Sequence, residues 1–176
     1  MLEAGYALAR WRSMTVFLPL ETGCRAMSDP RAEFLAGERP DDVALFLADS
    51  YVEDDRLEQF GEPVEGGVLI VVDGESGRNA FKAATGTDAM AFAKSAMATE
   101  SQIDDDLTDG VCPEEGDSDG GGDADESTDH GVQFVFAFAE EQNEDVGGLY
   151  AEGDVVHAYA KCDCGTAYSD RWTAEP

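Results

Sequence analysis

Four runs of apolar residues, each bounded by polar turn residues, predict the strands of a β-sheet. Residues 43–47 form a short apolar run between Asp42 and Asp49, for which a helix over residues 41–51 is the alternative, and residues 68–72 are five aliphatic residues in succession. An uninterrupted run of this kind is typical of a strand whose two faces are both covered. Two further strands are expected over residues 132–139 and 154–161, on either side of a glycine-containing connection.

The third run carries aromatic residues at every second position. Phe134, Phe136 and Phe138 therefore share one face of the strand, because successive side chains point to opposite faces. Burying each ring is worth roughly 1.5 to 3 kcal/mol, so this face must lie against other elements. We expect it to contact two helices, predicted over residues 77–85 and 88–98, on a single face of the sheet.

The last two strands should pair as an antiparallel hairpin around Gly147 and Gly148. Paired positions in such a hairpin have a constant sum, which is about 295 for a turn centred on these glycines. This register sets His130 opposite a position near residue 165, so the start of one strand and the end of the other meet at the same edge.

Together these patterns predict a single α+β domain over residues 27–176. Its centre is one mostly antiparallel sheet of about four strands with helices on one face. Residues 104–129 contain 12 acidic residues and three consecutive glycines, and such a stretch buries too little apolar surface to order itself. We therefore expect residues 104–131 to form a long, flexible, acidic loop. A calcium-binding loop is the alternative, although the spacing of an EF-hand is missing.

The overall charge narrows the classes of function. The chain has 11 basic and 39 acidic residues, which gives a formal net charge of −28. A surface this acidic repels phosphate backbones and anionic membranes, and no apolar run approaches the length of about 18 residues that suggests a membrane span. We therefore expect a cytoplasmic protein that binds neither nucleic acid nor membranes.

The distribution of the charge indicates adaptation to high salt. Acidic residues occur in nearly every polar stretch, and the basic residues are 8 Arg and only 3 Lys. In molar salt the Debye length falls to about 3 Å, so the self-repulsion of such a chain is largely screened. This composition favours a halophilic protein from a haloarchaeal cytosol. A mesophilic protein with an acidic binding face is the alternative.

Residues 1–26 differ from the rest of the chain, with a net charge of +1 against −29 for residues 27–176. After Met27, Asp29 can cap a helix and Pro30 suits its first position, so the chain reads as a protein start from this point. We interpret residues 1–26 as a disordered extension translated from a misassigned start. An export signal is the alternative, but its apolar run is short and is interrupted by a proline.

Three segments carry a resemblance to a known family, namely residues 84–90 (ATGTDAM), 138–143 (FAEEQN) and 147–154 (GGLYAEGD). From Met27 onward the chain resembles an uncharacterised haloarchaeal family of unknown function. The resemblance implies a halophilic origin and a start at Met27. It implies no activity and no catalytic residue.

The cysteines provide the candidate chemistry. Cys162 and Cys164 form a C-x-C-G turn, and Cys112 precedes a proline, as is common at zinc knuckles. Apart from Cys24 in the N-terminal extension, the domain has three cysteines, and an odd number in a reducing cytosol argues against a disulfide framework. Tetrahedral zinc needs a fourth ligand, and the hairpin register favours His130 over His157, which faces away from Cys162 on a regular strand. The sequence thus predicts a structural zinc site, with free thiols and a redox C-x-C pair as alternatives. Its ligands are Cys112, His130, Cys162 and Cys164.

Two classes of function remain open. The first is a binding or regulatory module that contacts a protein partner through aromatic side chains near the hairpin. These are Tyr150, Tyr159, Tyr168 and Trp172. The second is an enzyme with a small acid–base site near the C-terminal hairpin, for which Glu141 and His157, with Glu140 beside them, are the candidates. A zinc ion with four protein ligands favours the module, because it leaves no open position for catalysis.

We expect the fold to require high salt. Transfer from molar salt to dilute buffer should lower the melting temperature and the ellipticity, because the carboxylates repel one another once screening is removed. Thermal melts followed by circular dichroism across a salt series measure this effect. An unchanged melting temperature in dilute buffer would contradict the halophilic interpretation.

Overall fold

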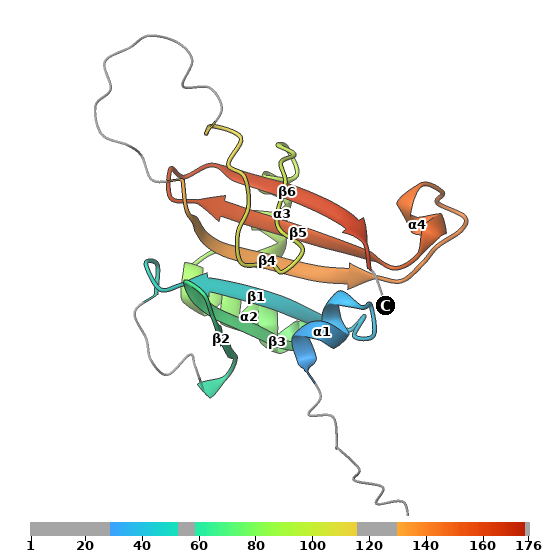
Figure 1. Cartoon of the computed structure of the whole chain (residues 1–176), viewed down its shortest axis with the longest axis horizontal. Helices are drawn as coiled ribbons and strands as arrows, with labels where there is room; N and C mark the ends of the chain where they lie inside the picture. The colour runs from blue at the N-terminus through green and yellow to red at the C-terminus, as the bar shows by residue number, and fades with distance from the viewer. Residues whose placement is uncertain (1–28, 53–58, 116–129, 175–176) are drawn as a thin grey trace, which may run out of the picture.

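The computed structural model describes residues 29–52, 59–115 and 130–174 (Figure 1). Its centre is one sheet of six strands in the order β2-β3-β1-β4-β5-β6, and all neighbouring strands are antiparallel. The strands are β1 Asp42–Ala48, β2 Glu62–Val64, β3 Gly67–Asp73, β4 Val132–Glu140, β5 Val155–Cys162 and β6 Ala167–Thr173. The helices are α1 Pro30–Leu35, α2 Gly74–Thr85, α3 Ala89–Ala96 and α4 Leu149–Glu152.

The fold is therefore α+β with a single antiparallel sheet, as predicted, but the sheet has six strands rather than four. The four predicted strands correspond to β1, β3, β4 and β5. The two additional strands, β2 and β6, lie at the edges of the sheet. Edge strands are only partly buried, so their sequences lack the apolar runs by which the central strands are recognised.

The hairpin of β4 and β5 has the register that the sequence predicts. The paired positions from Phe134 and Lys161 to Glu140 and Val155 all sum to 295. A bulge at the start of β4 then shifts the pairing by one residue, so that Val132 lies opposite Cys162.

The phenylalanines of β4 face α2 and α3, which confirms the expected side of the sheet. Phe134 and Phe136 are 3% and 1% exposed. The ring of Phe81 in α2 lies 5.3 Å from each of them, and Phe92 in α3 lies 5.1 Å from Phe134. Phe138 is partly buried at the margin of this aromatic core.

Aspartate side chains define where these helices begin. Asp73 accepts a hydrogen bond from the backbone N–H of Ser76 at 3.0 Å, so α2 begins at Gly74, three residues earlier than expected. In the same way Asp88 accepts hydrogen bonds from the first turn of α3. Within the described residues, no helix has the length and apolar character that crossing a bilayer requires.

The opposite face of the sheet is covered by α1 and by the irregular segment 99–115, which Figure 1 shows in front of β4, β5 and β6. Phe34 of α1 is fully buried, and Ile103 and Leu107 are each 1% exposed. Segment 99–115 follows β6 through backbone hydrogen bonds, and the backbone N–H of Ile103 donates to the Asp170 carboxylate at 3.0 Å.

The structure thus differs from the sequence expectation in two respects. The helices do not all lie on one face, because α1 packs opposite α2 and α3. Residues 104–115 were expected to be part of a flexible acidic loop, yet they pack on the sheet. The prediction from acidic composition did not take account of two apolar side chains, Ile103 and Leu107, which are buried and hold this segment on the sheet. Residues 116–129, and the extension expected over residues 1–26, lie outside the described residues.

We expect replacement of Gly77 in α2 to destabilise the fold. A Cβ atom at this position would overlap Cγ2 of Val43 in β1, so Gly77→Ala forces the helix away from the sheet. Overpacking of this kind costs about 1 to 3 kcal/mol, which outweighs the higher helix propensity of alanine. Asn79→Ala, at an exposed position of the same helix, is the matched control and should leave the melting temperature unchanged or raise it. Equal stability of the two variants would show that α2 does not approach β1 this closely.

Candidate metal centre

The four residues that the sequence singles out as ligands come together at one end of the sheet. Cys112 lies near the end of segment 99–115, His130 precedes β4, Cys162 ends β5, and Cys164 lies in the turn between β5 and β6. Their ligand atoms all lie within 4.8 Å of one another. The structure therefore assembles a compact group of three sulfurs and one imidazole from three separate parts of the chain.

Segment 99–115 folds back on itself and thereby places Cys112 at the candidate centre. Ile103 and Gly110 form an antiparallel bridge, and the backbone N–H of Val111 donates to the carbonyl of Gln102 at 2.8 Å. Cys112, the next residue, is 1% exposed. Cys112 can be buried beside the other ligands only if segment 99–115 keeps this fold. The geometry of the site therefore depends on the order of the segment.

The pairing of β4 with β5 positions His130. The backbone N–H of Asp163 donates to the carbonyl of Gly131 at 2.9 Å, which ties the start of β4 to the end of β5. Nδ1 of His130 consequently lies 3.6 Å from Sγ of Cys162. The antiparallel pairing that the sequence predicts, shifted by one residue at the bulge, thus brings His130 and Cys162 together.

A tight turn positions the last two sulfurs. Gly165 has φ +93°, which favours glycine, and its N–H donates to the carbonyl of Cys162 at 2.8 Å. The turn directs Cys164 toward segment 99–115, where its Sγ lies 3.6 Å from Sγ of Cys112. The C-x-C-G sequence therefore places its two sulfurs against two different partners.

The spacing of these atoms fits a tetrahedral zinc ion. With Zn–S near 2.3 Å and Zn–N near 2.0 to 2.1 Å, tetrahedral geometry places two sulfurs about 3.8 Å apart and a sulfur and a nitrogen about 3.6 Å apart. One pair of each kind in the group lies 3.6 Å apart. Three thiolates and an imidazole are also the donors that zinc favours in structural sites.

The two cysteines of the turn differ in how readily they carry charge. The hydroxyl and the backbone N–H of Thr166 hydrogen bond to Sγ of Cys164 and lower the pKa of this thiol to about 6. Burial raises the pKa of Cys162 to about 12. Cys164, the more exposed of the two, is therefore the sulfur best prepared to meet a cation as a thiolate.

Tyr168 of β6 is a neighbour of the group that sequence reasoning missed. It is fully buried in the same core as Cys112 and Cys162. Burial and the neighbouring cysteines raise the pKa of its phenol, which therefore stays protonated. Among the described residues, its hydroxyl oxygen is the one buried side-chain oxygen or nitrogen without a hydrogen-bond partner. The sequence signal that could have identified Tyr168 is the C-x-C-G turn itself. A strand after this turn would pair with β5, and the alternation of side chains would then place residue 168 on the same face as Cys162.

The predicted acid–base site is only partly assembled. His157 lies in a groove of about 840 Å³ between α3 and the ends of β4, β5 and β6. Its Nε2 atom lies 3.2 Å from a carboxylate oxygen of Glu140 and 3.1 Å from the hydroxyl of Tyr150. Glu140, not Glu141, is the partner, because alternation along β4 turns residue 140 to the face of His157 and residue 141 away from it.

The aromatic residues proposed as a partner surface do not form one. Tyr159 and Tyr168 are 4% and 0% exposed and belong to opposite cores of the sheet. Only Tyr150 and Trp172 of the four are partly exposed. The aromatic side chains of this hairpin therefore serve mainly to cover the two faces of the sheet.

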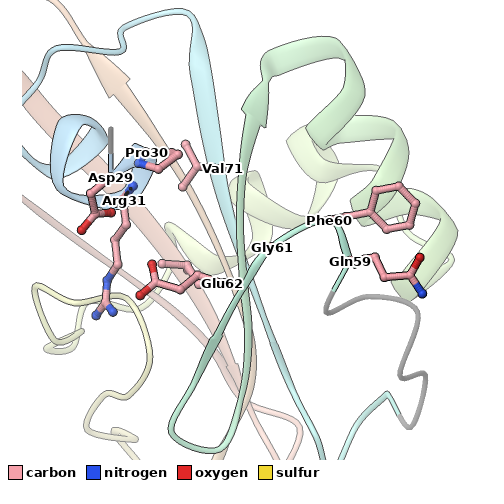
Figure 2. A pocket seen from close by; sticks show the side chains of 9 residues that line it. Asp29, Pro30, Arg31, Gln59, Phe60, Gly61, Glu62 and Val71 are labelled. Atoms are coloured by element: carbon pink, nitrogen blue, oxygen red, sulfur yellow. Dashed lines mark hydrogen bonds between the residues drawn. The ribbon is translucent and has the colours of Figure 1, made fainter. Parts of the chain in front are cut away.

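A second cavity, of about 640 Å³, lies beside the N-terminus of α1. Figure 2 shows Asp29 and Arg31 on one side of Gly61, and Gln59 and Phe60 on the other. The lining side chains therefore do not converge on a common point, and the cavity offers no constellation comparable to the cysteine and histidine group.

In the part of the chain that the structure describes, the fold and the site together define an α+β protein with one candidate metal centre. Residues 61–175, more than half of the chain, match a family of unknown function (DUF5807), and the protein belongs to this family. No curated protein and no solved structure matches the chain. The matched region contains all four residues of the candidate centre, whereas α1 and β1 precede it.

We expect His157 to titrate below its ordinary pKa of 6.5, because burial lowers the pKa more than Glu140 raises it. The stability that neutral His157 contributes should be complete above pH 6.5 and should be lost as the pH falls below it. The chain has two histidines, so NMR titration of the wild type and a His130 variant assigns each ring.

Glu140→Gln should lower the pKa of His157 further, since the carboxylate favours the charged ring. In denaturation experiments, the wild type should lose stability relative to His157→Gln as the pH falls from about 7 to 5. A pKa of His157 at or above 6.5 would contradict the burial of this ring.

Proposed function

We propose that this protein binds one structural zinc ion and acts as a small binding or regulatory module. The observation that carries the proposal is the convergence of four ligand atoms within 4.8 Å. The ligands are Cys112, His130, Cys162 and Cys164. Zinc would join the far end of segment 99–115 to the end of the β4–β5 hairpin, two parts of the chain that the sheet alone connects weakly.

The composition of the ligand set supports a structural role. Catalytic zinc sites usually have three protein ligands and keep one position for water or substrate, whereas structural sites use four. Here four protein ligands are present, and two of them, Cys112 and Cys162, are almost completely buried. An ion at this site would thus contribute free energy of folding rather than activate a reactant.

The proposed setting follows from the charge. A net charge of −28 with few lysines suits a halophilic protein in a salt-rich cytoplasm. The same charge disfavours nucleic acid and anionic membranes as partners, so a protein is the partner that we propose. The acidic surface would give such an association a strong dependence on salt.

A second candidate function is an enzyme that uses His157. The observation that favours it is the contact of this half-buried ring with Glu140 and Tyr150 inside the groove. A neutral histidine oriented by a carboxylate can act as a general base. The Glu140 side chain is 57% exposed, however, which weakens the orienting interaction, and we rank this function below the module.

Metal analysis tests the proposed function. Protein purified with zinc supplied should contain about one zinc ion per chain, and a chelator should lower its melting temperature in saturating salt. Cys164→Ser should reduce the zinc content and the melting temperature, and the chelator should then have little further effect. Cys24→Ser is the control, because Cys24 lies in the N-terminal extension that precedes the expected domain, and we expect it to behave as the wild type.

Free thiols would give a different pattern. Replacement of a buried cysteine that binds no metal typically costs about 0.5 to 3 kcal/mol, and a chelator would leave both proteins unaltered. Zinc content below about 0.2 per chain, together with equal melting temperatures with and without chelator, would rule out the metal role.

A further inference from the structure

The hydroxyl of Tyr168 is the clearest unexplained polar group near the candidate centre. The side chain is completely buried, with 0% exposure to solvent, and its hydroxyl has no hydrogen-bond partner among the described residues. Tyr168 pairs with Ala160 in β5, two residues before Cys162. A Cβ atom at Gly110, two residues before Cys112, would lie 2.8 Å from the hydroxyl. The phenol thus lies between the two chain segments that supply the buried cysteines.

A buried hydroxyl without a partner is unfavourable, and native proteins rarely retain one. The sulfurs of Cys112 and Cys162, which belong to the same core cluster as Tyr168, are the candidate acceptors, and their strength depends on their protonation. A thiol is a weak acceptor, whereas a thiolate is a strong one, because charge-assisted hydrogen bonds are about twice as strong as neutral ones. The hydroxyl therefore acquires a good partner only when the cysteines are ionised, as metal binding requires.

We propose that Tyr168 is a positioning residue of the metal centre, and that its hydroxyl donates a hydrogen bond to the metal-bound thiolate of Cys112 or Cys162. This inference rests on the proposed zinc function. Gly110 carries no side chain that would block the approach of the hydroxyl to segment 99–115.

Charge balance supports this role. Three thiolates and one divalent ion leave a net charge of −1 in a buried place, which needs hydrogen-bond donors around the sulfurs. As thiolates, Cys164 would accept a hydrogen bond from the hydroxyl of Thr166, which lies 3.4 Å from its Sγ, and Cys162 would accept one from the backbone N–H of Cys164. The described hydrogen bonds give Cys112 no donor other than neighbouring thiols. Tyr168 is the buried donor that remains to complete the set.

Tyr168→Phe tests the inference, with Tyr150→Phe as the matched control. Tyr150 hydrogen bonds to His157 in the groove on the other face of the sheet, so its hydroxyl is remote from the sulfurs. We expect Tyr168→Phe to weaken zinc binding about 10- to 100-fold in competition with a chelator, and Tyr150→Phe to leave it unchanged. In the cobalt-substituted proteins, only Tyr168→Phe should shift the sulfur-to-cobalt charge-transfer band.

The metal-free proteins provide a second readout of opposite sign. Without metal the Tyr168 hydroxyl lacks a partner, so Tyr168→Phe should melt at the same temperature as the wild type or higher. With zinc it should melt lower. Because phenylalanine keeps the ring that fills the core, folding of the variant can be verified by circular dichroism before metal is added.

Three outcomes would overturn the inference or its foundation. Equal zinc affinity and an unchanged cobalt band in Tyr168→Phe would overturn the role of Tyr168 and leave the zinc site intact. Equal destabilisation of the metal-free and zinc-loaded variant would assign the residue a packing role only. Failure of the wild type to bind zinc or cobalt would instead overturn the proposed function itself.

Discussion

The antiparallel pairing of β4 with β5 is the constraint on which the rest of the structure depends. Because side chains alternate along both strands, one register assigns the aromatic residues of β4 to one face and Cys162 to the other. The same register brings His130 level with the turn after β5. A slip of one residue would exchange the two faces and separate the histidine from the sulfurs. The core and the candidate centre are thus consequences of a single pairing.

The two faces of the sheet are covered by different means. On one face, interlocking rings from α2, α3 and β4 fill the space between helices and strands. The other face is rich in alanine beneath segment 99–115, at Ala137, Ala158 and Ala160, which lets an irregular backbone approach closely. That segment has few apolar side chains to hold it and many carboxylates that repel one another. A zinc ion at its far end would supply the attachment that its composition does not.

Patterns that depend on local periodicity were readable from the sequence. The alternating phenylalanines and the paired glycines gave the correct face and register, and the register brought His130 to the end of the sheet that holds Cys162 and Cys164. The position of Cys112 depends instead on the fold of segment 99–115. The edge strand β6 was not recognised, because its sequence AYSDRWT contains no apolar run and its pairing depends on β5. The order of residues 104–115 was also missed, since it arises from contacts of Ile103 and Leu107 with distant strands. Tertiary contacts of this kind leave little trace in composition.

Salt affects the surface charge of the protein and the proposed charge of its metal centre differently. Molar salt screens exposed carboxylates over a few ångströms, so the repulsion along the surface is tolerable there. Salt does not reach a buried complex of three thiolates and a divalent ion, whose charge of −1 must be balanced by donors within the fold. The C-x-C-G turn therefore has two roles in the proposed centre. It directs two sulfurs toward different partners, and it and the following residue Thr166 provide the hydrogen-bond donors for them. A metal site in so acidic a protein depends on these local hydrogen bonds rather than on the overall field.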